Sequence, residues 1–453
     1  MSLLKRIEDK QAVVCVVGLG YVGLPLAVQY SMAGFKTIGI DLDAAKVDAV
    51  NSSKNYIGDV ESAHLEYVVR SGLLRASKSY DPVADADVVF ICVPTPFTPT
   101  KDPDISYIMS ASHEIKQRLR KGQLVILKST TFPSTTEEYV LPALEESGLK
   151  AGKDFHLAFS PERIDPGNKK FTIHNTPIVV GGLTPECTSV AAAITRQVIG
   201  QVVPVSSPRI AEMEKLLENI FRSVNIALVN EMAQLCDRMG GIDIWEVVEA
   251  AATKPFGYMP FYPGPGIGGH CILIDPYYLS WLARKYDFQT NFITLAAETN
   301  ENMPFVVKDR VIEEIAHLPV TIEEARILVL GAAFKRNVDD TRHSPAIKVF
   351  ELLLQAGARN LAYHDPFVPE LDICGERFVS VQLTPDELSN STCTVILTDH
   401  SQFDYVMIGE NARLIIDTRN AMKQIQTPRA RVVKLGGGAS MNGQKEHVSQ
   451  SVK

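Results

Sequence analysis

The first 200 residues alternate short, β-branched apolar runs with longer stretches in which polar and apolar residues are mixed. The apolar runs predict strands at 13–17, 36–41, 86–93, 123–129, 155–160 and 176–182. Polar, amphipathic stretches such as 44–51 and 106–120 lie between them and predict helices. Because strands that alternate with helices are typical of βαβ units, we expect a largely parallel sheet with helices on both faces.

A different pattern begins near residue 206 and predicts one long helix. Ser207 suits the N-cap and Pro208 the first helical position, while Gly240 and Gly241 end the segment. At 1.5 Å per residue, a helix of this extent would be roughly 45–50 Å long. Such a helix, apolar over much of its surface, is expected to link two domains or to form a dimer interface.

A second α/β unit is predicted from about residue 322. ARILVLGAAFK reads as a strand, IKVFELLLQAG as a helix, and LAYHDPF, STCTVILTDH and ARLIIDTRN as further strands. The end of the chain has no apolar periodicity and is expected to be disordered. The predicted parts are an N-terminal domain at 1–205, a central helical domain at 206–318, a C-terminal domain at 319–435 and a disordered tail at 436–453.

Composition and charge narrow the possible functions. The 453 residues include 45 basic and 53 acidic side chains, and the net charge of −8 argues against a nucleic-acid or membrane surface. The seven cysteines are scattered and form no C-x-x-C pair, so we expect neither a disulfide framework nor a metal site, and a cytoplasmic location. The apolar run at 12–28 is broken by glycines and Pro25, which favours a strand, a turn and a helix over a signal peptide or membrane span.

Gly18, Gly20 and Gly23 form a G-x-G-x-x-G pattern between the first strand and the first long helix. The first glycine permits the turn, the second lets a pyrophosphate approach the backbone, and the third lets helix and strand pack closely. Asp41 ends the second strand, where an acid that binds ribose is expected, and it favours NAD over NADP because a 2′-phosphate would meet like charge. The alternative is a tight turn without a nucleotide. With the second α/β unit, this predicts two Rossmann-like, doubly wound parallel-sheet domains joined by a long central helix.

The segment PGPGIGGHCILIDP, residues 263–276, is a candidate site of covalent chemistry. Glycines strip side chains from the backbone just before Cys271, and Asp275 follows four residues later. An accessible thiol suits a nucleophile, because the thiolate is the reactive form. The alternative is a buried cysteine in a turn.

Two further groups carry charge in suggestive places. Lys215 and Asn219 are four residues apart and therefore share one face of the long helix, although a solvated lysine is the alternative. FKRNVDDTRHSPA, residues 334–346, gathers Lys335 and two arginines around a turn after a strand. In a chain of net negative charge this cluster predicts a phosphate clamp, with a solvated basic loop as the alternative.

Taken together, these motifs resemble the nucleotide-sugar (UDP-sugar) 6-dehydrogenases from residue 10 to about residue 430. GLGYVGLPLA, CVPTP, KST, SPER, KLLENIFRSVNIALVNE, PGIGGHC and AFKRNVDDTRHSP occur in the family's order and spacing. SPERIDPGNKKF, ATKPFGYMPFYPGPGIGGHC and DPYYL are similar to the UDP-N-acetylhexosamine branch, most of all to UDP-N-acetyl-D-glucosamine 6-dehydrogenase. Ile274 stands where the UDP-glucose branch carries lysine, and Leu273 where the hexosamine branch usually carries proline.

The resemblance implies that two NAD oxidise the C6 alcohol of UDP-N-acetyl-D-glucosamine to a uronic acid, through a thiohemiacetal and a thioester on Cys271, for surface polysaccharide synthesis. It implies that Lys215 and Asn219 stabilise the oxyanion, that Asp275 holds the water acting as base, and that Glu162 and Thr130 position the hydrolytic water. The residues implied in binding NAD are Gly18, Gly20, Val22, Gly23, Asp41, Lys46, Thr95, Thr130 and Arg342. Those implied in binding the UDP-sugar are Glu162, Arg163, Lys215, Asn219, Tyr262, Gly268, Lys335 and Arg419.

Other interpretations of the sequence stay open. The substrate could instead be UDP-N-acetyl-D-mannosamine or UDP-glucose, which differ in the pocket around C2. An idle NAD- or UDP-sugar-binding regulator and a β-hydroxyacid dehydrogenase are alternatives of other classes. We expect a homodimer or higher homo-oligomer through the long helix.

Overall fold

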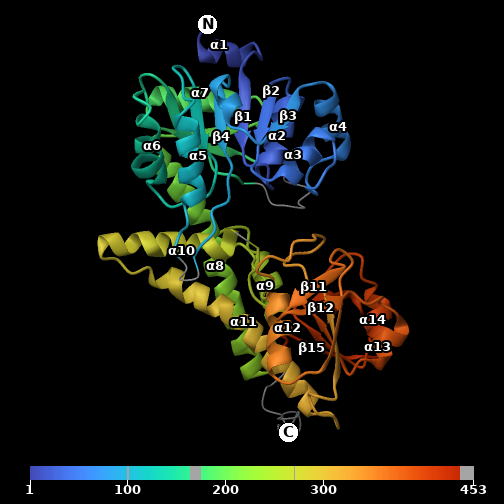
Figure 1. Ribbon diagram of the computed structural model, residues 1–453. Helices are drawn as coiled ribbons and strands as arrows, with labels where there is room; N and C mark the ends of the chain where they lie inside the picture. The colour runs from blue at the N-terminus through green and yellow to red at the C-terminus, as the bar shows by residue number, and fades with distance from the viewer. Residues whose placement is uncertain (99–101, 164–174, 270, 439–453) are drawn as a thin grey trace. The chain divides into compact units, whose positions relative to one another are not determined.

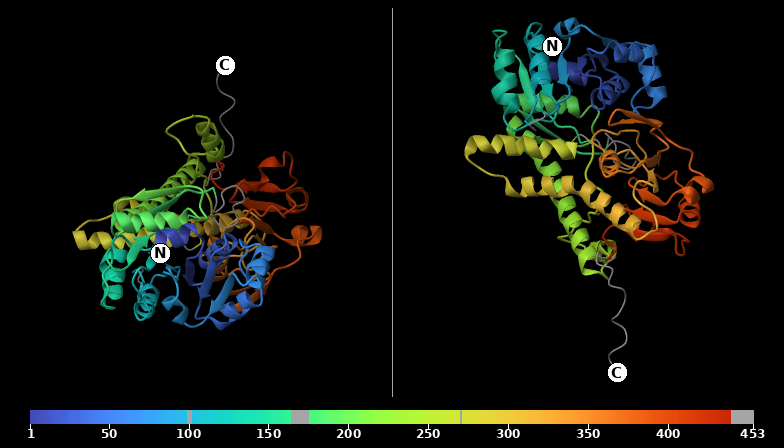
Figure 2. Two further views of the ribbon diagram at one scale, coloured as in Figure 1. Left: turned by 90° about the horizontal axis from the view of Figure 1, so that it is seen from above. Right: turned by 60° about the horizontal axis from the view of Figure 1, so that its bottom comes forward.

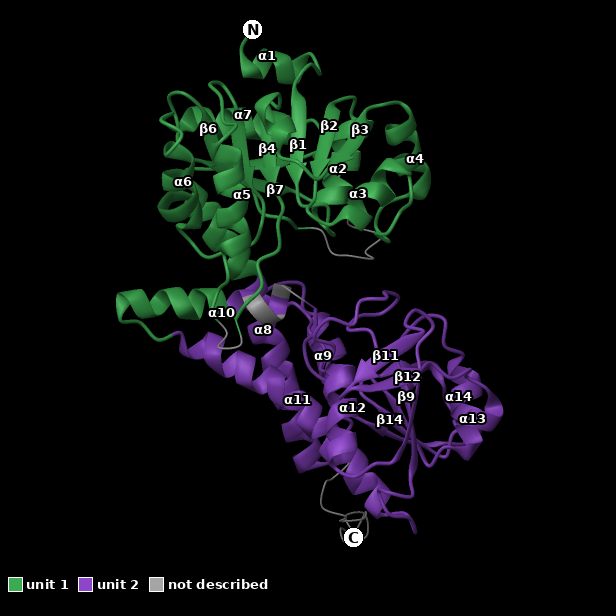
Figure 3. Ribbon diagram, viewed as in Figure 1, with its two compact units in different colours: residues 1–218, 277–289 green, residues 219–276, 290–453 purple. Residues whose placement is uncertain are grey.

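The computed structural model describes residues 1–98, 102–163, 175–269 and 271–438, apart from the side chains of Cys271, Leu273 and Ile274. Two compact units make up the chain (Figure 3). The first is Met1–Glu218 with Tyr277–Gln289, and the second is Asn219–Pro276 with Thr290–Lys453. Residues expected to form a separate central domain are thus divided between the two units, and the boundaries predicted at 205 and 318 stay predictions.

The first unit is built on a sheet with the strand order β3-β2-β1-β4-β5-β6-β7-β8 (Figure 1). Every pair of neighbours is parallel except β6 and β7. The strands are β1 (Val13–Val17), β2 (Lys36–Ile40), β3 (Leu74–Ser77), β4 (Val88–Ile91), β5 (Leu124–Leu127), β6 (His156–Phe159), β7 (Ile178–Gly182) and β8 (Val202–Val205). The predicted strands are confirmed, whereas β3 and β8 were not predicted.

Helices cover both faces of this sheet. In β1, Val14 and Val16 pack into one apolar core, while Cys15 and Val17 pack into another on the opposite face. Since neighbouring side chains of a strand point to opposite faces, two cores mean that the sheet is doubly wound, as predicted. The helical segments are α1 (Leu3–Glu8), α2 (Gly23–Met32), α3 (Ala44–Asn51), α4 (Ser62–Arg70), η1 (Asp81–Ala84), α5 (Ser106–Lys116), η2 (Thr136–Val140), α6 (Leu141–Glu145), α7 (Pro185–Thr195) and η3 (Arg284–Tyr286).

Helix α8 (Pro208–Met239) confirms the predicted long helix and is 32 residues long. The Ser207 hydroxyl accepts a hydrogen bond from the Ile210 N–H at 3.3 Å, as an N-cap should. At the other end Gly240 has a φ of +72°, a conformation that glycine adopts easily. The helix is one continuous ribbon in Figure 2, and the boundary between the units falls within it.

The second unit has a parallel sheet with the order β10-β9-β13-β14-β15, and β11 and β12 form a separate antiparallel hairpin. This confirms the second Rossmann-like fold, although β15 was not predicted. The strands are β9 (Arg326–Leu330), β10 (Asn360–His364), β11 (Glu370–Ile373), β12 (Glu376–Val379), β13 (Cys393–Ile396), β14 (Leu414–Asp417) and β15 (Arg431–Lys434). The remaining helical segments, of which α10 extends into the first unit, are α9 (Ile244–Ala252), α10 (Cys271–Ala283), α11 (Asn291–Ala316), α12 (Pro345–Gln355), α13 (Pro385–Asn390), α14 (Tyr405–Asn411) and η4 (Ala421–Gln424).

The chain returns to α8 after β15. The N–H groups of Gly436 and Gly438 donate to the Asp237 carboxylate at 3.1 and 3.2 Å, and the Ile244 N–H donates to the Gly436 carbonyl at 2.9 Å. The prediction of a disordered tail is therefore wrong for residues 436–438, because a buried carboxylate binds their backbone. The rest of the predicted tail, 439–453, lies outside the described residues. Among the helices of the described chain, none combines the length and apolar character that crossing a bilayer requires.

Candidate active site

The glycine turn after β1 has the geometry that its sequence predicts. Gly18 has a φ of +92°, and its N–H donates to the Ile40 carbonyl at 2.7 Å. A Cβ on Gly18 would lie 2.5 Å from the Cys92 carbonyl oxygen, and one on Gly23 would lie 1.7 Å from the Gly18 oxygen. Side chains are excluded at both positions because the backbone packs closely there.

The second glycine of the turn is different. A Cβ on Gly20 would meet nothing within 4 Å among the described residues, so this side of the turn is open. Helix α2 begins just beyond it at Gly23, and its N-cap residue, Val22, makes no side-chain capping hydrogen bond. The N-terminus of α2 thus offers backbone N–H groups and partial positive charge beside an open backbone, which suits a pyrophosphate.

Asp41 follows β2 and lies beside the glycine turn. Its carboxylate accepts hydrogen bonds from the Leu19 N–H at 2.8 Å and the Asp43 N–H at 2.9 Å. The Lys46 ammonium is 3.6 Å from the same carboxylate, whose side chain stays 12% exposed. The structure therefore brings Asp41 and Lys46 together, with acceptor capacity left for a ribose hydroxyl.

Further predicted residues follow β4, β5 and β6 at the same edge of the sheet. Thr95 is buried, and its carbonyl accepts a hydrogen bond from the Tyr278 hydroxyl of α10. Thr130 is half-buried two residues beyond Lys128, and Glu162 is buried just after β6. Because these strands are parallel neighbours, their carboxyl ends share the edge at which ligands of such sheets bind.

Lys128 is a further residue of this edge; it lies in the KST motif, but no role was predicted for it from the sequence. Its side chain is buried, and its ammonium lies 3.5 Å from the Glu162 carboxylate and 3.3 Å from the Ser160 carbonyl. Burial raises the pKa of the nearby Cys92 thiol to about 12, although Lys128 acts in the opposite direction. A lysine directly after a continuous apolar run could have revealed this buried charge, because a buried ammonium needs a partner.

Arg163 lies beside the start of α8, within the first unit. Its guanidinium forms ion pairs with Glu214 and, at 2.7 Å, with Glu218, and it donates to the Pro177 carbonyl at 2.8 Å. Burial and then the neighbouring Glu218 raise the pKa of Glu214 to about 7. If Arg163 binds the substrate, its guanidinium does so while it is also paired with Glu214 and Glu218.

Lys215 is buried on α8, and its ammonium has no hydrogen bond or ion pair within the described parts of the chain. One turn later Asn219 is fully buried, and its amide nitrogen donates to the Asp275 carboxylate of α10. Arg222 donates to the Asn219 oxygen and so fixes the orientation of the amide. Helix α10 begins at Cys271, whose side chain lies outside the described residues.

The two loops singled out in the second half of the sequence pack against each other. A Cβ on Gly268 would lie 2.6 Å from the Phe334 Cβ, and the Gly269 N–H donates to the Arg342 carbonyl at 3.0 Å. The Arg342 guanidinium binds the Asp340 carboxylate at 2.6 Å, while Lys335 is half-buried in the same loop. The glycines are thus needed for close contact between the loops.

Arg419 and Tyr262 occupy the same unit as these loops. Arg419 follows β14 and donates to the Leu397 carbonyl at 2.9 Å, and burial lowers its pKa. A Cβ on Gly264 would lie 2.7 Å from its guanidinium. The Tyr262 ring stacks on Trp245, with 5.6 Å between ring centroids.

Sequence models of the UDP-glucose/GDP-mannose dehydrogenase family match three parts of the chain. The NAD binding domain matches residues 12–199, the central domain residues 209–302 and the UDP binding domain residues 328–424. The first of these confirms NAD as the cofactor. The open turn, the helix N-terminus and Asp41 fit that group.

Whole-chain relatives carry related names. The UDP-N-acetyl-D-mannosamine dehydrogenase of Escherichia coli K12 is 34% identical over 91% of this chain and 99% of its own length. The NDP-N-acetyl-D-galactosaminuronic acid dehydrogenase of Ralstonia solanacearum is 33% identical over 92% of this chain and 97% of its own. The structure of UDP-D-ManNAc dehydrogenase from Pyrococcus horikoshii superposes with a TM-score of 0.85 at 32% identity, over 94% of this chain and all of that one.

Proposed function

Because the chain belongs to the UDP-glucose/GDP-mannose dehydrogenase family, we propose that this NAD-dependent enzyme oxidises the C6 alcohol of a UDP-N-acetylhexosamine to a carboxylate. One observation carries the proposal. The buried pair of Asn219 and Asp275 lies one turn from Lys215 along α8 and one turn from Cys271 along α10. A cation, an amide, a carboxylate and a thiol are the groups that a thiol-dependent alcohol oxidation uses.

The overall reaction converts a primary alcohol, two NAD⁺ and one water into a carboxylate, two NADH and three protons. When bound, NAD accepts the hydride that leaves C6 in each oxidation. Between the two oxidations the Cys271 thiolate adds to the aldehyde carbon and forms a thiohemiacetal, which loses the second hydride to become a thioester. Water then attacks the thioester, the C–S bond breaks, and the thiol is regenerated.

Lys215 and Asn219 stabilise the negative charge that develops on the C6 oxygen. The Asn219 amide has two N–H groups, of which one donates to Asp275, so the second can donate to the oxyanion. The Lys215 ammonium is buried and has no partner among the described residues, so its charge is weakly screened. Asp275 holds the water that takes the alcohol proton in the first step.

Glu162 and Thr130 are the residues that we propose for positioning the water that hydrolyses the thioester. The Lys128 ammonium is 3.5 Å from the Glu162 carboxylate and holds that carboxylate in place at the edge of the first sheet. An ionised carboxylate is an acceptor only, so it orients the water by accepting one of its protons.

The remaining predicted residues act in binding. For NAD we propose the turn and its surroundings, Gly18, Gly20, Val22, Gly23, Asp41, Lys46, Thr95, Thr130 and Arg342. For the UDP-sugar we propose Glu162, Arg163, Lys215, Asn219, Tyr262, Gly268, Lys335 and Arg419. Lys335 and Arg419 are the cations that suit the diphosphate.

The sugar that we propose is UDP-N-acetyl-D-mannosamine. The sequence alone pointed first to UDP-N-acetyl-D-glucosamine, but relatives 34% identical to this chain carry the mannosamine name, which supports the alternative better. A relative 33% identical carries a galactosaminuronic acid name, so the acetamido group is the shared feature. UDP-glucose is the less favoured substrate.

We further propose a homodimer that works in the cytoplasm on precursors of surface polysaccharides. Helix α8 leaves apolar side chains such as Leu228, Leu235 and Met239 exposed on the isolated chain. Their spacing along the helix places them near one another, which suits burial against a second copy. Analytical ultracentrifugation of the wild type and of a Leu228→Glu, Leu235→Glu double variant tests this: a monomer in both cases contradicts it.

The function is tested by counting NADH formed per sugar with limiting substrate and excess NAD. The panel is UDP-N-acetyl-D-mannosamine, UDP-N-acetyl-D-glucosamine, UDP-N-acetyl-D-galactosamine and UDP-glucose. We expect two NADH per mannosamine sugar and little turnover of UDP-glucose. One NADH per sugar would contradict the role of Cys271, and preference for UDP-glucose would contradict the proposed sugar.

A further inference from the structure

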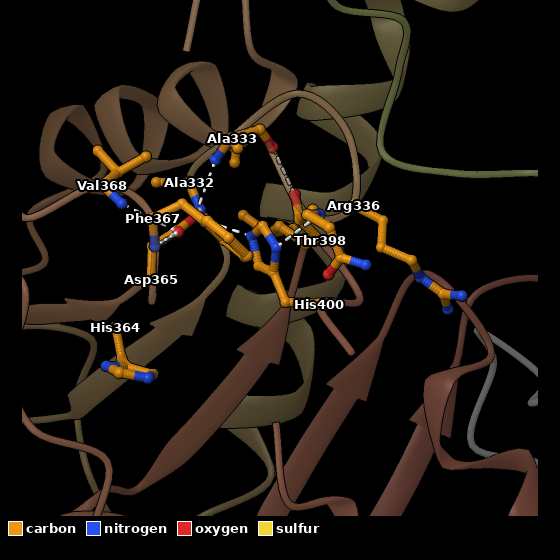
Figure 4. Close-up of polar contacts among 12 residues, drawn as sticks. Ala332, Ala333, Arg336, His364, Asp365, Phe367, Val368, Thr398 and His400 are labelled. Atoms are coloured by element: carbon orange, nitrogen blue, oxygen red, sulfur yellow. Dashed lines mark hydrogen bonds and ion pairs between the residues drawn. The ribbon is translucent and has the colours of Figure 1, made fainter. Parts of the chain in front are cut away.

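A fully buried acid organises the carboxyl edge of the second sheet. One oxygen of Asp365 accepts hydrogen bonds from the Ala332 N–H at 2.7 Å and the Ala333 N–H at 3.1 Å. The other oxygen accepts from the Phe367 N–H at 2.8 Å and the Val368 N–H at 3.2 Å. Asp365 therefore ties the segment after β9 to the segment after β10, as Figure 4 shows.

His400 extends this network to the segment after β13. Its Nε2 lies 3.0 Å from the oxygen of Asp365 that the two alanines share, and its Nδ1 is 3.0 Å from the Asn337 nitrogen. A backbone N–H can only donate, so Nδ1 is an acceptor and the ring proton is on Nε2. Both side chains of the pair are 0% exposed, and the imidazole therefore bridges Asp365 and the backbone of Asn337 in one fixed tautomer.

Aromatic rings hold the imidazole in place. The ring centroid of His400 is 5.1 Å from that of Phe367 and 5.3 Å from that of Phe403. The ring planes meet at 40° and 88°, so the imidazole is held from two sides. Its orientation is thus set by packing as well as by hydrogen bonds.

Further contacts link the loop at 331–337 to the segment at 398–401. The Thr398 hydroxyl donates to the Ala333 carbonyl at 2.6 Å, and the Arg336 Nε donates to the Asp399 carbonyl at 2.8 Å. The side-chain oxygen of Asn337 accepts from the Ser401 N–H at 2.9 Å. Lys335 lies between these anchors, two residues after Ala333 and two before Asn337.

We propose that His400 and Asp365 are positioning residues that hold the loop at 331–337 in the conformation that binds a nucleoside diphosphate. The proposal rests on the proposed function, because it assigns Lys335 to the diphosphate. The loop follows β9 where the strand order reverses toward β13, which is the edge at which ligands bind in such sheets. A loop already fixed before the ligand arrives loses less entropy on binding, and therefore binds more tightly.

Two substitutions of His400 distinguish the hydrogen bond at Nδ1 from the one at Nε2. In His400→Asn the side-chain oxygen can occupy the place of Nδ1 and accept from the Asn337 N–H, but nothing donates to Asp365. In His400→Gln the amide nitrogen can reach the place of Nε2 and donate to Asp365, but the Asn337 N–H loses its acceptor. Both variants lose one buried hydrogen bond, so their thermal stabilities should fall by similar amounts.

Calorimetry with UDP as the probe and the full-length protein measures the effect. We expect the dissociation constant for UDP to rise roughly tenfold in His400→Gln and no more than about threefold in His400→Asn, because only the former frees the loop. The KM for the UDP-sugar should follow this order, while kcat and the KM for NAD stay near the wild-type values. Histidine ¹⁵N shifts of the wild type should show His400 protonated on Nε2 alone.

His364→Asn is the matched control. His364 is a half-buried neighbour whose Nδ1 bonds the Val381 carbonyl at 2.7 Å, and it contacts the loop through its backbone carbonyl, which the substitution keeps, so UDP affinity should not change. Equal UDP affinity in the wild type and His400→Gln, or equal loss in Gln and Asn variants of equal stability, would overturn the proposal. A wild-type protein that binds no UDP would instead contradict the proposed function.

Discussion

Gly18 and Gly331 occupy the same place in their two sheets. Gly18 follows β1 with a φ of +92°, and Gly331 follows β9 with a φ of +86°. Gly18 donates its N–H to the Ile40 carbonyl at 2.7 Å, and Gly331 donates to the His364 carbonyl at 2.9 Å, each at the end of the neighbouring strand. The same backbone turn therefore opens the first crossover of both sheets.

The acids beside these turns also correspond. Asp41 follows β2 and accepts from the Leu19 N–H at 2.8 Å, while Asp365 follows β10 and accepts from the Ala332 N–H at 2.7 Å. Asp41 keeps 12% of its side chain exposed, whereas the side chain of Asp365 is 0% exposed and accepts a further hydrogen bond from His400. The same turn can thus bind a ligand or stabilise the fold. Which of the two it does depends on whether the remaining acceptor sites of the acid face solvent or are bound by other parts of the chain.

The strongest way to test this comparison is to remove both acids. Asp365→Ala leaves several buried donors unsatisfied and should lower the free energy of unfolding of the second unit by roughly 3–5 kcal/mol. Asp41→Ala should cost about 1 kcal/mol in the first unit and raise the KM for NAD about tenfold. Tryptophan fluorescence can follow each unit separately, because Trp281 belongs to the first unit and Trp245 to the second.

Single-tryptophan backgrounds serve as the controls for that measurement. Trp281→Phe leaves only the second unit reporting, and Trp245→Phe leaves only the first. Equal losses of stability from the two alanine substitutions would contradict the difference that we draw between the acids.

A second test sharpens the account of the first turn. Gly23→Ala would place a Cβ 1.7 Å from the Gly18 oxygen, so the first unit should lose about 3 kcal/mol of stability. Gly20→Ala meets nothing within 4 Å among the described residues and should change stability by less than about 0.5 kcal/mol. It should still raise the KM for NAD, since the new methyl group takes the space of the pyrophosphate. Denaturant titration with NAD kinetics measures both effects, and an unchanged KM in Gly20→Ala would refute the open-turn interpretation.

A substitution of Lys128 tests whether the carboxyl edge of the first sheet takes part in the chemistry, which we do not propose for the second sheet. Lys128→Met keeps the length of the side chain but removes the charge beside Glu162, so kcat should fall roughly 10- to 100-fold with the KM for NAD unchanged. Thioester hydrolysis is the step expected to slow, and rapid-quench detection of an acylated enzyme would reveal it. Full turnover in Lys128→Met would mean that the pair is structural.

The smallest expected effect is a pH dependence of the second unit. Burial raises the pKa of Asp365, but the hydrogen bond from His400 and those from the backbone outweigh it, so its pKa lies below the ordinary value. A depressed carboxyl pKa stabilises the fold above the unfolded value of about 3.9, and this contribution is lost as the pH falls through the folded pKa. Urea titrations followed at Trp245 should therefore show a steeper acid loss in the wild type than in Asp365→Asn. An equal loss of stability with falling pH in the wild type and in Asp365→Asn would contradict this.

Much of the fold was readable because its signals are local. The apolar runs of β1 and β4, the Ser207 cap and the glycine turn each depend on a few adjacent residues. β8 was missed because only its ends are half-buried and Pro204 lies within it, so neither apolar content nor alternation marks it.

The site was predicted less completely because its partners are distant in sequence. Asn219 and Asp275 meet in the fold although 56 residues separate them in the sequence. Their roles could therefore be proposed only from the family resemblance. Lys128 and His400 each follow a strand, and no role was predicted for either from the sequence because their partners Glu162 and Asp365 are distant in the chain. Which side chains share a sheet edge depends on strand order, and strand order is not written in any short segment.

The return of the chain to α8 affects the order in which the protein can be made. The Trp245 indole donates to the Leu435 carbonyl at 2.8 Å, across 190 residues of sequence. At about 5–20 residues per second, a ribosome needs roughly 10–40 s to supply that partner. Until then the Trp245 indole of α9 lacks its hydrogen-bond acceptor. The second unit therefore cannot complete its fold before residue 435 has been synthesised.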